Sequence, residues 1–372
     1  MPTQSTHHRP LNVAVTGWGT GWHVMPLVSF LEYVTTSTHL KEKCNHIYWV
    51  GASSSMEEEQ AKAFDDVVFL PILSGKLRRY LWEWAWRKNI RDFFFVLFGV
   101  VQWVWYIWKY RIDVVFGKWG YVSFPLCIAA WLLRKKVILH ESDMHPGLAN
   151  RLLFPFATEI FTWFPLERKR TTHVGQLLSL QFLSAWGDAW DQDAGRVTHV
   201  LVLGWSQWAR SIFDALLIYF AQEISTTPLE ELFCFHITLG TKNDHYAELF
   251  APYSDFVKTY TFLPLSDMVA LYRIGDIAIT RGGATSLAEQ KLFGIVSGII
   301  PLPFTGGNHQ YHNACWYRDT HGDTLIAQDD LMVFGIRQFL DAHIGYKKSL
   351  QDVSPARLME TYERVTQAVF SV

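Results

Sequence analysis

The residues most able to do chemistry near the start of the chain lie in a glycine-rich stretch, residues 17–23, which reads GWGTGWH. We expect a strand to end and a helix to begin there, and in open α/β sheets such a turn binds phosphate through free backbone N–H groups. As a dinucleotide-binding fingerprint it is weak, because no acidic residue follows the expected second strand, which ends at Val50. The stretch also lacks the Gly-Lys-Ser/Thr of a P-loop. The dehydrogenase and NTPase classes are therefore disfavoured.

Short apolar runs and longer helical segments alternate along the chain, and this pattern predicts the strands and helices that position the loop. We expect strands at residues 11–16, 46–50, 67–70, 113–116 and 136–140, and after a polar stretch at residues 198–203, 233–237, 257–260, 277–280 and 299–301. Helices are expected at residues 23–33, 126–133, 284–293 and 355–372. The pattern predicts an α/β fold of two Rossmann-like doubly wound domains with a cleft between them.

The domain boundaries follow from where this alternation breaks. We expect an N-terminal acceptor and membrane-associating domain in residues 1–165, a linker region in residues 166–197 and a second domain in residues 198–350. Residues 351–372 form a closing helix that could pack on either domain.

Charge and cysteine content limit the classes of partner. The formal net charge of −2 argues against bulk binding of nucleic acid, which needs a basic surface to neutralise phosphates. The four cysteines lie far apart without a C-x-x-C pair, so we interpret them as isolated buried thiols and expect no metal. The N-terminus has no basic start followed by an apolar segment of signal-peptide length, which favours a cytoplasmic location.

A basic and aromatic segment, residues 76–111, stands apart from the alternation. It has eight basic residues against two acids, and in residues 93–108 only Gln102 is polar. An apolar run of this length is short for a transmembrane helix, which needs about 20 residues. We therefore expect a helix pair that lies in the bilayer interface. The alternative is a buried core helix.

Five further stretches carry a resemblance to a known family. They read GKWGYVSFP (117–125), ILHESDMHPGLANRL (138–152), LVLGWSQWAR (201–210), TRGGATSLAE (280–289) and PLPFTGGNHQYHNA (301–314). With the first glycine loop, their order and spacing closely resemble the MurG family of glycosyltransferases over about residues 11–340. The resemblance implies a GT-B fold with an acceptor domain first and a UDP-GlcNAc-binding domain second.

The same resemblance implies an activity and a location. The family transfers GlcNAc from UDP-GlcNAc to the C4 hydroxyl of the muramoyl sugar of undecaprenyl-linked lipid I, giving lipid II for peptidoglycan. The transfer inverts the anomeric centre and needs no metal or other cofactor. The expected location is peripheral, at the cytoplasmic face of the cell membrane, with residues 76–111 meeting its surface.

Carried over position by position, the resemblance implies an acceptor site in the first half. His23 matches the proposed general base, and Thr20 and Gly21 belong to the loop expected at the acceptor diphosphate. Tyr121 and Asn150 are expected to line the cleft. Asp143 stands where the family usually has Asn, and its charge makes it a second candidate for the base.

The donor site is expected in the second half. Ser206 and Gln207 would hold the UDP diphosphate, and Glu289 would accept hydrogen bonds from the ribose hydroxyls. Phe262 and Leu263 are expected to flank the uracil, and Gln310 and Asn313 to contact the sugar hydroxyls. The turn before the helix of Glu289 is formed by Arg281, Gly283, Ala284 and Thr285. One departure concerns charge, because Gly175 is followed by Gln176 where the family has Asn-Pro-x-Arg. Arg210 or Arg281 would compensate, or the donor would bind more weakly.

Tryptophan is unusually abundant, at 17 of 372 residues. Five of them, Trp18, Trp22, Trp119, Trp205 and Trp208, stand where the family has glycine and where a phosphate-binding loop needs a small residue. We predict that these are UGA codons that mean glycine in the source and have been read as Trp. The alternative is a non-catalytic relative with blocked loops. A GT-B enzyme acting on another lipid, such as diacylglycerol, is the other alternative function.

Overall fold

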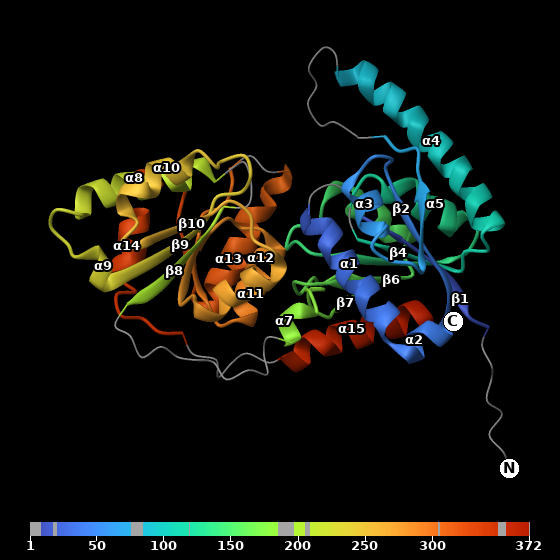
Figure 1. Ribbon diagram of the computed structural model, residues 1–372. Coiled ribbons are helices and arrows are strands. Elements are labelled where there is room, and N and C mark those ends of the chain that lie inside the picture. The colour runs from blue at the N-terminus through green and yellow to red at the C-terminus, as the bar shows by residue number, and fades with distance from the viewer. Residues whose placement is uncertain are drawn as a thin grey trace. The chain divides into compact units, whose positions relative to one another are not determined.

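A computed structural model divides the chain into two α/β units (Figure 1). It describes residues 9–17, 21–75, 85–118, 120–184, 197–204, 209–303, 306–348 and 355–371. The first unit comprises Met1–Leu180 and Ala356–Val372, and the second comprises Gln181–Pro355. The chain passes from one unit to the other inside the segment that the sequence predicts to be a linker.

The first unit is built on a seven-stranded sheet with the order β3-β2-β1-β4-β5-β6-β7, in which every pairing is parallel. The strand order reverses between β1 and β4, and ligands bind beyond the carboxyl ends of the strands at such a point. The strands are β1 (Leu11–Thr16), β2 (Cys44–Gly51), β3 (Val67–Pro71), β4 (Val114–Gly117), β5 (Lys136–Glu141), β6 (Glu159–Thr162) and β7 (Thr171–His173).

Helices cover both faces of this sheet, because its strands are apolar on both sides. One face packs against α4, α5 and α6 with η1 in a single hydrophobic cluster. On the other face, Phe30 of α1 contacts Phe116 of β4 with 4.8 Å between ring centroids. The helices are α1 (Gly21–Thr36), α2 (Thr38–Lys43), α3 (Met56–Ala61), α4 (Ala85–Lys109), α5 (Ser123–Leu132), α6 (Leu148–Leu153) and η1 (Phe154–Phe156).

The closing helix, α15 (Pro355–Phe370), packs on the first unit and so decides between the two alternatives that the sequence leaves open. Thr361 Oγ1 donates to the carbonyl of Val174 at 2.9 Å, and Lys136 Nζ donates to the carbonyl of Ala368 at 2.7 Å. The chain therefore returns from the second unit to complete the first.

The second unit repeats the same topology with six parallel strands in the order β10-β9-β8-β11-β12-β13. Its order reverses between β8 and β11. The strands are β8 (Thr198–Leu203), β9 (Phe233–Thr238), β10 (Val257–Tyr260), β11 (Ile277–Thr280), β12 (Val296–Ile299) and β13 (Thr324–Leu325). One face packs against α8, α10 and α14 in a hydrophobic cluster.

The remaining elements connect these strands. They are α7 (Gln181–Ser184), α8 (Arg210–Glu223), α9 (Leu229–Leu232), α10 (Tyr246–Phe250), η2 (Ala251–Tyr253), α11 (Leu265–Ile274), α12 (Ala284–Leu292), η3 (Gly306–Asn308), α13 (His309–His321), η4 (Leu331–Gly335) and α14 (Ile336–Asp341).

Two expectations are corrected. The strand expected at residues 299–301 is β12, three residues earlier, because Pro301 has no N–H to donate to a neighbouring strand. The expected interfacial helix pair is one continuous helix, α4, over the described part of that segment. The sequence prediction treated the segment as too short to span a membrane because its apolar run covers only residues 93–108. The helix itself is longer, because α4 has 25 residues.

Candidate active site

The first glycine loop lies beyond the carboxyl end of β1, at the point where the strand order of the first sheet reverses. The chain leaves β1 after Thr16, as the sequence predicts, and enters α1 at Gly21, two residues before the predicted start of the helix. His23 is in the first turn of α1. Thr20 lies outside the described residues, as does the side chain of His23, while the backbone of Gly21 is described.

The second loop of this unit follows β4, on the other side of the reversal. Gly120 has a φ of 120°, a conformation that favours glycine, and its carbonyl accepts a hydrogen bond from Ser123 Oγ at 2.7 Å. Tyr121 is half-buried in the turn that leads into α5. The turn thus holds Tyr121 beside the carboxyl end of the sheet, while Trp119 lies outside the described residues.

Lys118, at the end of β4, is fully buried and forms the centre of a polar network that the sequence analysis missed. Its Nζ lies 2.8 Å from His140 Nδ1 and donates to Ser142 Oγ at 2.6 Å and to Gln176 Oε1 at 2.7 Å. Three acceptors match the three protons of an ammonium group. His140 Nε2 lies 2.9 Å from the carbonyl of Gly175, so the neutral ring donates there and accepts from Lys118 through Nδ1.

Burial governs the charge of this network. Desolvation lowers the pKa of Lys118 to about 7, although the nearby charges of Glu141 and Asp143 act to raise it. Desolvation and the adjacent ammonium hold the pKa of His140 well below its ordinary value, so the ring is neutral. Below about pH 7 the network is therefore one buried cation held by neutral acceptors, with the carboxyl groups of Glu141 and Asp143 beside it.

Glu141, at the end of β5, connects two residues that the sequence analysis placed in the acceptor site. Its Oε1 accepts from the backbone N–H of Asp143 at 3.0 Å, and its Oε2 accepts from Asn150 Nδ2 at 2.8 Å. Burial, together with the charge of Asp143, raises the pKa of Glu141 to about 7. Asn150 Oδ1 is buried without a hydrogen-bond partner among the described residues. The structure thus brings Asp143 and Asn150 together through a carboxylate.

In the second unit, the loop after β8 begins at Gly204. A Cβ there would lie 2.3 Å from Phe213 Cζ and 2.6 Å from the carbonyl oxygen of Thr238, so no side chain fits. Ser206 and Gln207, the predicted diphosphate residues, lie outside the described residues, as do Trp205 and Trp208. The described chain resumes at Ala209, and α8 begins at Arg210.

Arg281 follows β11 and is buried, with its guanidinium turned to partners inside the unit. It donates to Ser211 Oγ at 2.8 Å, to Gln328 Oε1 at 2.7 Å and to the carbonyl of Ile300 at 3.2 Å. Desolvation lowers the pKa of Arg281 to about 10. These bonds tie the end of β11 to α8 and to the segment after β12.

Glu289 lies on α12, and its half-buried carboxylate has a partner that the sequence did not indicate. Tyr272 of α11 donates its hydroxyl to Glu289 Oε2 at 2.9 Å. Desolvation raises the pKa of Glu289 to about 7, and the Tyr272 hydrogen bond acts in the opposite direction. Tyr272 itself stacks on Phe293 with 5.4 Å between ring centroids, so the carboxylate is held by a fixed aromatic side chain.

Gln310 and Asn313 of α13 hold two loops at the carboxyl edge of the second sheet. Gln310 Oε1 accepts from the N–H of Leu302 at 2.9 Å, and Asn313 Nδ2 donates to the carbonyl of Gly282 at 3.0 Å. A Cβ on Gly282 would lie 2.4 Å from the Gln310 carbonyl oxygen, whereas one on Gly283 would meet nothing within 4 Å. Packing therefore requires glycine at position 282, while the space beside Gly283 is open.

The other predicted donor residues share this edge. Ala284 and Thr285 are buried in the first turn of α12, after the Gly283 N-cap. Leu263 is buried in the segment between β10 and α11, while Phe262 beside it is 69% exposed. An exposed aromatic ring beyond a strand end is free to stack on a planar base.

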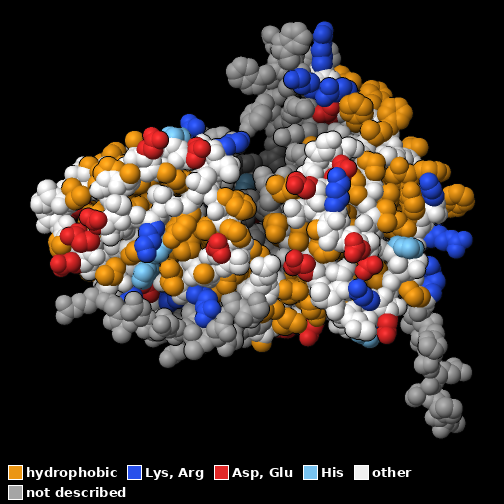
Figure 2. All heavy atoms as spheres, viewed as in Figure 1, with side chains coloured by type: hydrophobic (Ala, Val, Ile, Leu, Met, Phe, Trp, Pro, Cys, Tyr) orange, Lys and Arg blue, Asp and Glu red, His pale blue; other side chains and the backbone are white. Residues whose placement is uncertain are grey.

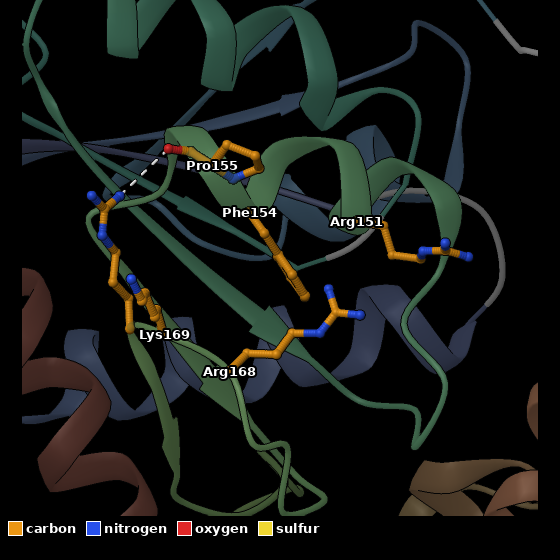
Figure 3. A pocket seen from close by; sticks show the side chains of 6 residues that line it. Arg151, Phe154, Pro155, Arg168 and Lys169 are labelled. Carbon is orange, nitrogen blue, oxygen red and sulfur yellow. Dashed lines mark hydrogen bonds between the residues drawn. The ribbon is translucent and has the colours of Figure 1, made fainter.

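A separate basic pocket of roughly 530 Å³ lies in the first unit (Figure 3). Arg151, Arg168, Lys169 and Arg170 line it together with Phe154 and Pro155. The Arg168 guanidinium lies over the Phe154 ring at 5.7 Å from its centroid. Its lining comes from the end of α6, from η1 and from the segment before β7, at the amino ends of the strands, so this pocket is away from the predicted acceptor loops.

Comparison with known proteins gives matches over both units. Residues 13–162 match the glycosyltransferase family 28 N-terminal domain, and residues 199–367 match the family 28 C-terminal domain. A relative in Legionella pneumophila (strain Corby) is 30% identical over 86% of this chain and 85% of its own length. One in Geobacillus thermodenitrificans is 33% identical over 78% of each chain. Both are named UDP-N-acetylglucosamine--N-acetylmuramyl-(pentapeptide) pyrophosphoryl-undecaprenol N-acetylglucosamine transferase.

Solved structures share the fold. MurG of Acinetobacter baumannii matches with a TM-score of 0.74 and 20% identity, covering 98% of this chain and 100% of that one. A UDP-GlcNAc 2-epimerase of Neisseria meningitidis, bound to UDP-GlcNAc, matches with a TM-score of 0.59 and 10% identity, covering 97% of this chain and 100% of that one. Two successive Rossmann-like units of the GT-B type are thus confirmed.

Proposed function

Because the chain belongs to glycosyltransferase family 28, within its MurG group, we propose that it transfers GlcNAc from UDP-GlcNAc to lipid I and so forms lipid II. The observation that carries this proposal is the similarity to a transferase of that name, 30% identical over 86% of the chain. The topology supports it, because each sheet reverses its strand order beside a glycine loop, which suits one site for the acceptor and one for the donor.

The transfer forms a bond between the acceptor C4 oxygen and the anomeric carbon and breaks the bond from that carbon to the UDP oxygen. Inversion requires a base to take the acceptor proton and a cradle for the leaving diphosphate. We assign the base to His23 or Asp143. Glu141 is a positioning residue here, because it holds Asp143 through the backbone and Asn150 through the side chain.

Lys118 is buried and holds together the strand ends that carry the acceptor site. It ties the end of β4 to Ser142 at the end of β5 and to Gln176. Its positive charge stabilises carboxylates on the Glu141–Asp143 segment. Thr20, Gly21 and Tyr121 complete this acceptor site.

The donor site belongs to the second unit. Glu289 accepts the ribose hydroxyls, Phe262 and Leu263 flank the uracil, and the turn formed by Arg281, Gly283, Ala284 and Thr285 shapes the loop. Gln310 reads the sugar, and Ser206 and Gln207 hold the diphosphate. Asn313, which is fully buried, positions the Gly282 loop instead of contacting the sugar. Arg281 donates to three internal acceptors, so we assign the compensating positive charge to Arg210, which is exposed at the first residue of α8.

Helix α4 is the proposed contact with the membrane. Within the described residues it is the one helix long and apolar enough to cross a bilayer, over Arg87–Lys109. One stripe along it is exposed at helical spacing: Ile90, Phe94, Phe98, Val101, Trp105 and Trp108. Figure 2 shows hydrophobic side chains gathered over this helix, with Lys and Arg side chains at its amino end.

The opposite stripe of α4 belongs to the first unit. Trp103 and Ile107 are buried, and Gln102 accepts from the N–H of Leu73 at 2.9 Å and donates to the carbonyl of Pro71. A spanning orientation would pull these groups out of the unit and into lipid. The contacts therefore support a helix that lies along the bilayer surface, on a peripheral protein at the cytoplasmic face.

Parallel transfer assays test the acceptor class. Radiolabelled UDP-GlcNAc is offered to the protein with lipid I and, separately, with diacylglycerol in the same detergent. Label in the lipid I product alone supports the proposal. Label in the diacylglycerol product alone would show that diacylglycerol, not lipid I, is the acceptor.

A further inference from the structure

A cluster of three metal-binding side chains lies on the second unit, outside the proposed transferase site. His199 is on β8, and Cys234 and His236 are on the neighbouring strand β9. The strand register places His199 directly opposite Cys234. Residues two apart on a strand face the same side, so all three side chains project from one face of the sheet.

The residues between them point the other way. Val200 and Phe235 lie in the hydrophobic cluster on the opposite face. The three ligands are thus not part of that core packing. Two of them, His199 and Cys234, are half-buried and within reach of solvent, while His236 is buried.

We propose that His199, Cys234 and His236 form a zinc site. The three ligand atoms all lie within 4.8 Å of one another. His199 Nδ1 lies 3.1 Å from His236 Nε2, and Cys234 Sγ lies 3.6 Å from the same nitrogen. Tetrahedral zinc, with its usual bond lengths, separates two nitrogens by roughly 3.3 Å and a nitrogen and a sulfur by roughly 3.6 Å.

The surroundings orient the ring of His236 for this role. Its Nδ1 lies 3.1 Å from the hydroxyl oxygen of Tyr260 on β10. When Nδ1–H donates to that oxygen, the lone pair of Nε2 points toward His199 and Cys234, as in metal sites whose histidines are held by an oxygen partner.

The location places the ion away from the proposed transferase site. His199 and Cys234 are the second residues of their strands, near the amino end of the sheet, whereas Gly204 and the donor loops follow the carboxyl ends. Zinc there would join β8 to β9 and would leave one position to water. Lys258, opposite His236 on β10, is exposed, and solvent screens its charge.

Metal binding by tag-free full-length protein tests the site. After treatment with a chelator and dialysis, zinc is titrated by calorimetry, and cobalt is added separately to record the near-ultraviolet thiolate-to-cobalt band. We expect one zinc per chain, a rise in Tm with zinc, and a thiolate band with cobalt. Cys234→Ser should abolish the band and weaken zinc binding by about tenfold or more.

Cys315→Ser is the matched control, because Cys315 is another half-buried thiol of the same unit outside the cluster. It should bind both metals like the parent. His199→Asn gives a second route at a half-exposed position should Cys234→Ser fail to fold. Equal zinc affinity in the parent and all variants, or no zinc binding by the parent, would overturn the proposal. The three side chains would then be a hydrogen-bonded group and not a metal site.

Discussion

If Glu289 binds the ribose as proposed, donor binding is expected to depend on pH. Its pKa is raised to about 7, so the carboxyl is ionised above that pH and protonated below it. The ionised form accepts more hydrogen bonds from a diol. We therefore predict that Kd for UDP-GlcNAc rises as pH falls from 8 to 6, by up to about tenfold per pH unit below the pKa.

The measurement is calorimetric titration with UDP-GlcNAc, whose diphosphate is esterified at both ends and does not titrate near neutral pH. Glu289→Gln keeps an accepting oxygen and the shape of the side chain but cannot ionise. Its affinity should be lower at pH 8 and should vary much less with pH. A parent and a variant with the same pH profile would remove Glu289 from the ribose contact.

Lys118 contributes stability through its three buried hydrogen bonds. We predict that Lys118→Met lowers the free energy of unfolding by about 3–5 kcal/mol, because it leaves His140, Ser142, Gln176 and the Glu141 carboxylate without their cation. Denaturant unfolding measures this. Lys169→Met, at an exposed lysine of the same unit, should change it by no more than about 0.5 kcal/mol, and comparable losses in the two variants would contradict the account.

At the level of elements, α4 is the proposed membrane contact. Phe98 is 60% exposed on the unpartnered stripe, and we predict that Phe98→Asp weakens sedimentation with vesicles containing an anionic lipid by about tenfold or more, since burying such a side chain contributes about 1.5–3 kcal/mol. Phe334→Asp is the matched control, because Phe334 is 63% exposed on the second unit. Equal loss in both variants would mean that α4 is not the contact.

The sequence predicted the elements whose apolar patterning is strong. Strands 198–203, 257–260 and 277–280 are confirmed at the same residues. The first and the last are largely buried runs between turn signals, whereas only Val257 is buried in the strand at 257–260. Strand β7 was missed, since Thr171–His173 has no apolar residue and lies at the sheet edge. Its polar composition led us to interpret that segment as linker.

The candidate site was predictable only where a motif carries it. Asp143 and Asn150 were found through their motif, and the structure connects them. Lys118 lies in the quoted stretch 117–125, but its network and the contact of Tyr272 with Glu289 could not be predicted from a motif. The partners lie 22 to 58 residues away from Lys118 and 17 residues away from Tyr272. Such partners meet only through the order of strands and helices.

For the whole molecule, the identity of the loop tryptophans matters most. Gly204 and Gly282, in described parts of the loops, have no room for a Cβ, and Gly120 has a positive φ. Loops with so little space do not readily accommodate an indole side chain at the next position. We predict UGA codons at Trp18, Trp22, Trp119, Trp205 and Trp208.

The codon sequence and the intact mass of natively expressed protein check this prediction. Each misread residue lowers the native mass by the difference between an indole side chain and a hydrogen atom. UGG codons at these positions, together with the full tryptophan mass, would show that the residues are genuine and would favour a non-catalytic relative.

Transfer of labelled GlcNAc to lipid I by two forms of the full chain tests the central claim most directly. One form has glycine at the five loop positions, and the other has tryptophan there. We predict lipid II formation by the glycine form and little or none by the tryptophan form. A folded glycine form that neither binds UDP-GlcNAc nor labels lipid I would contradict the proposed function.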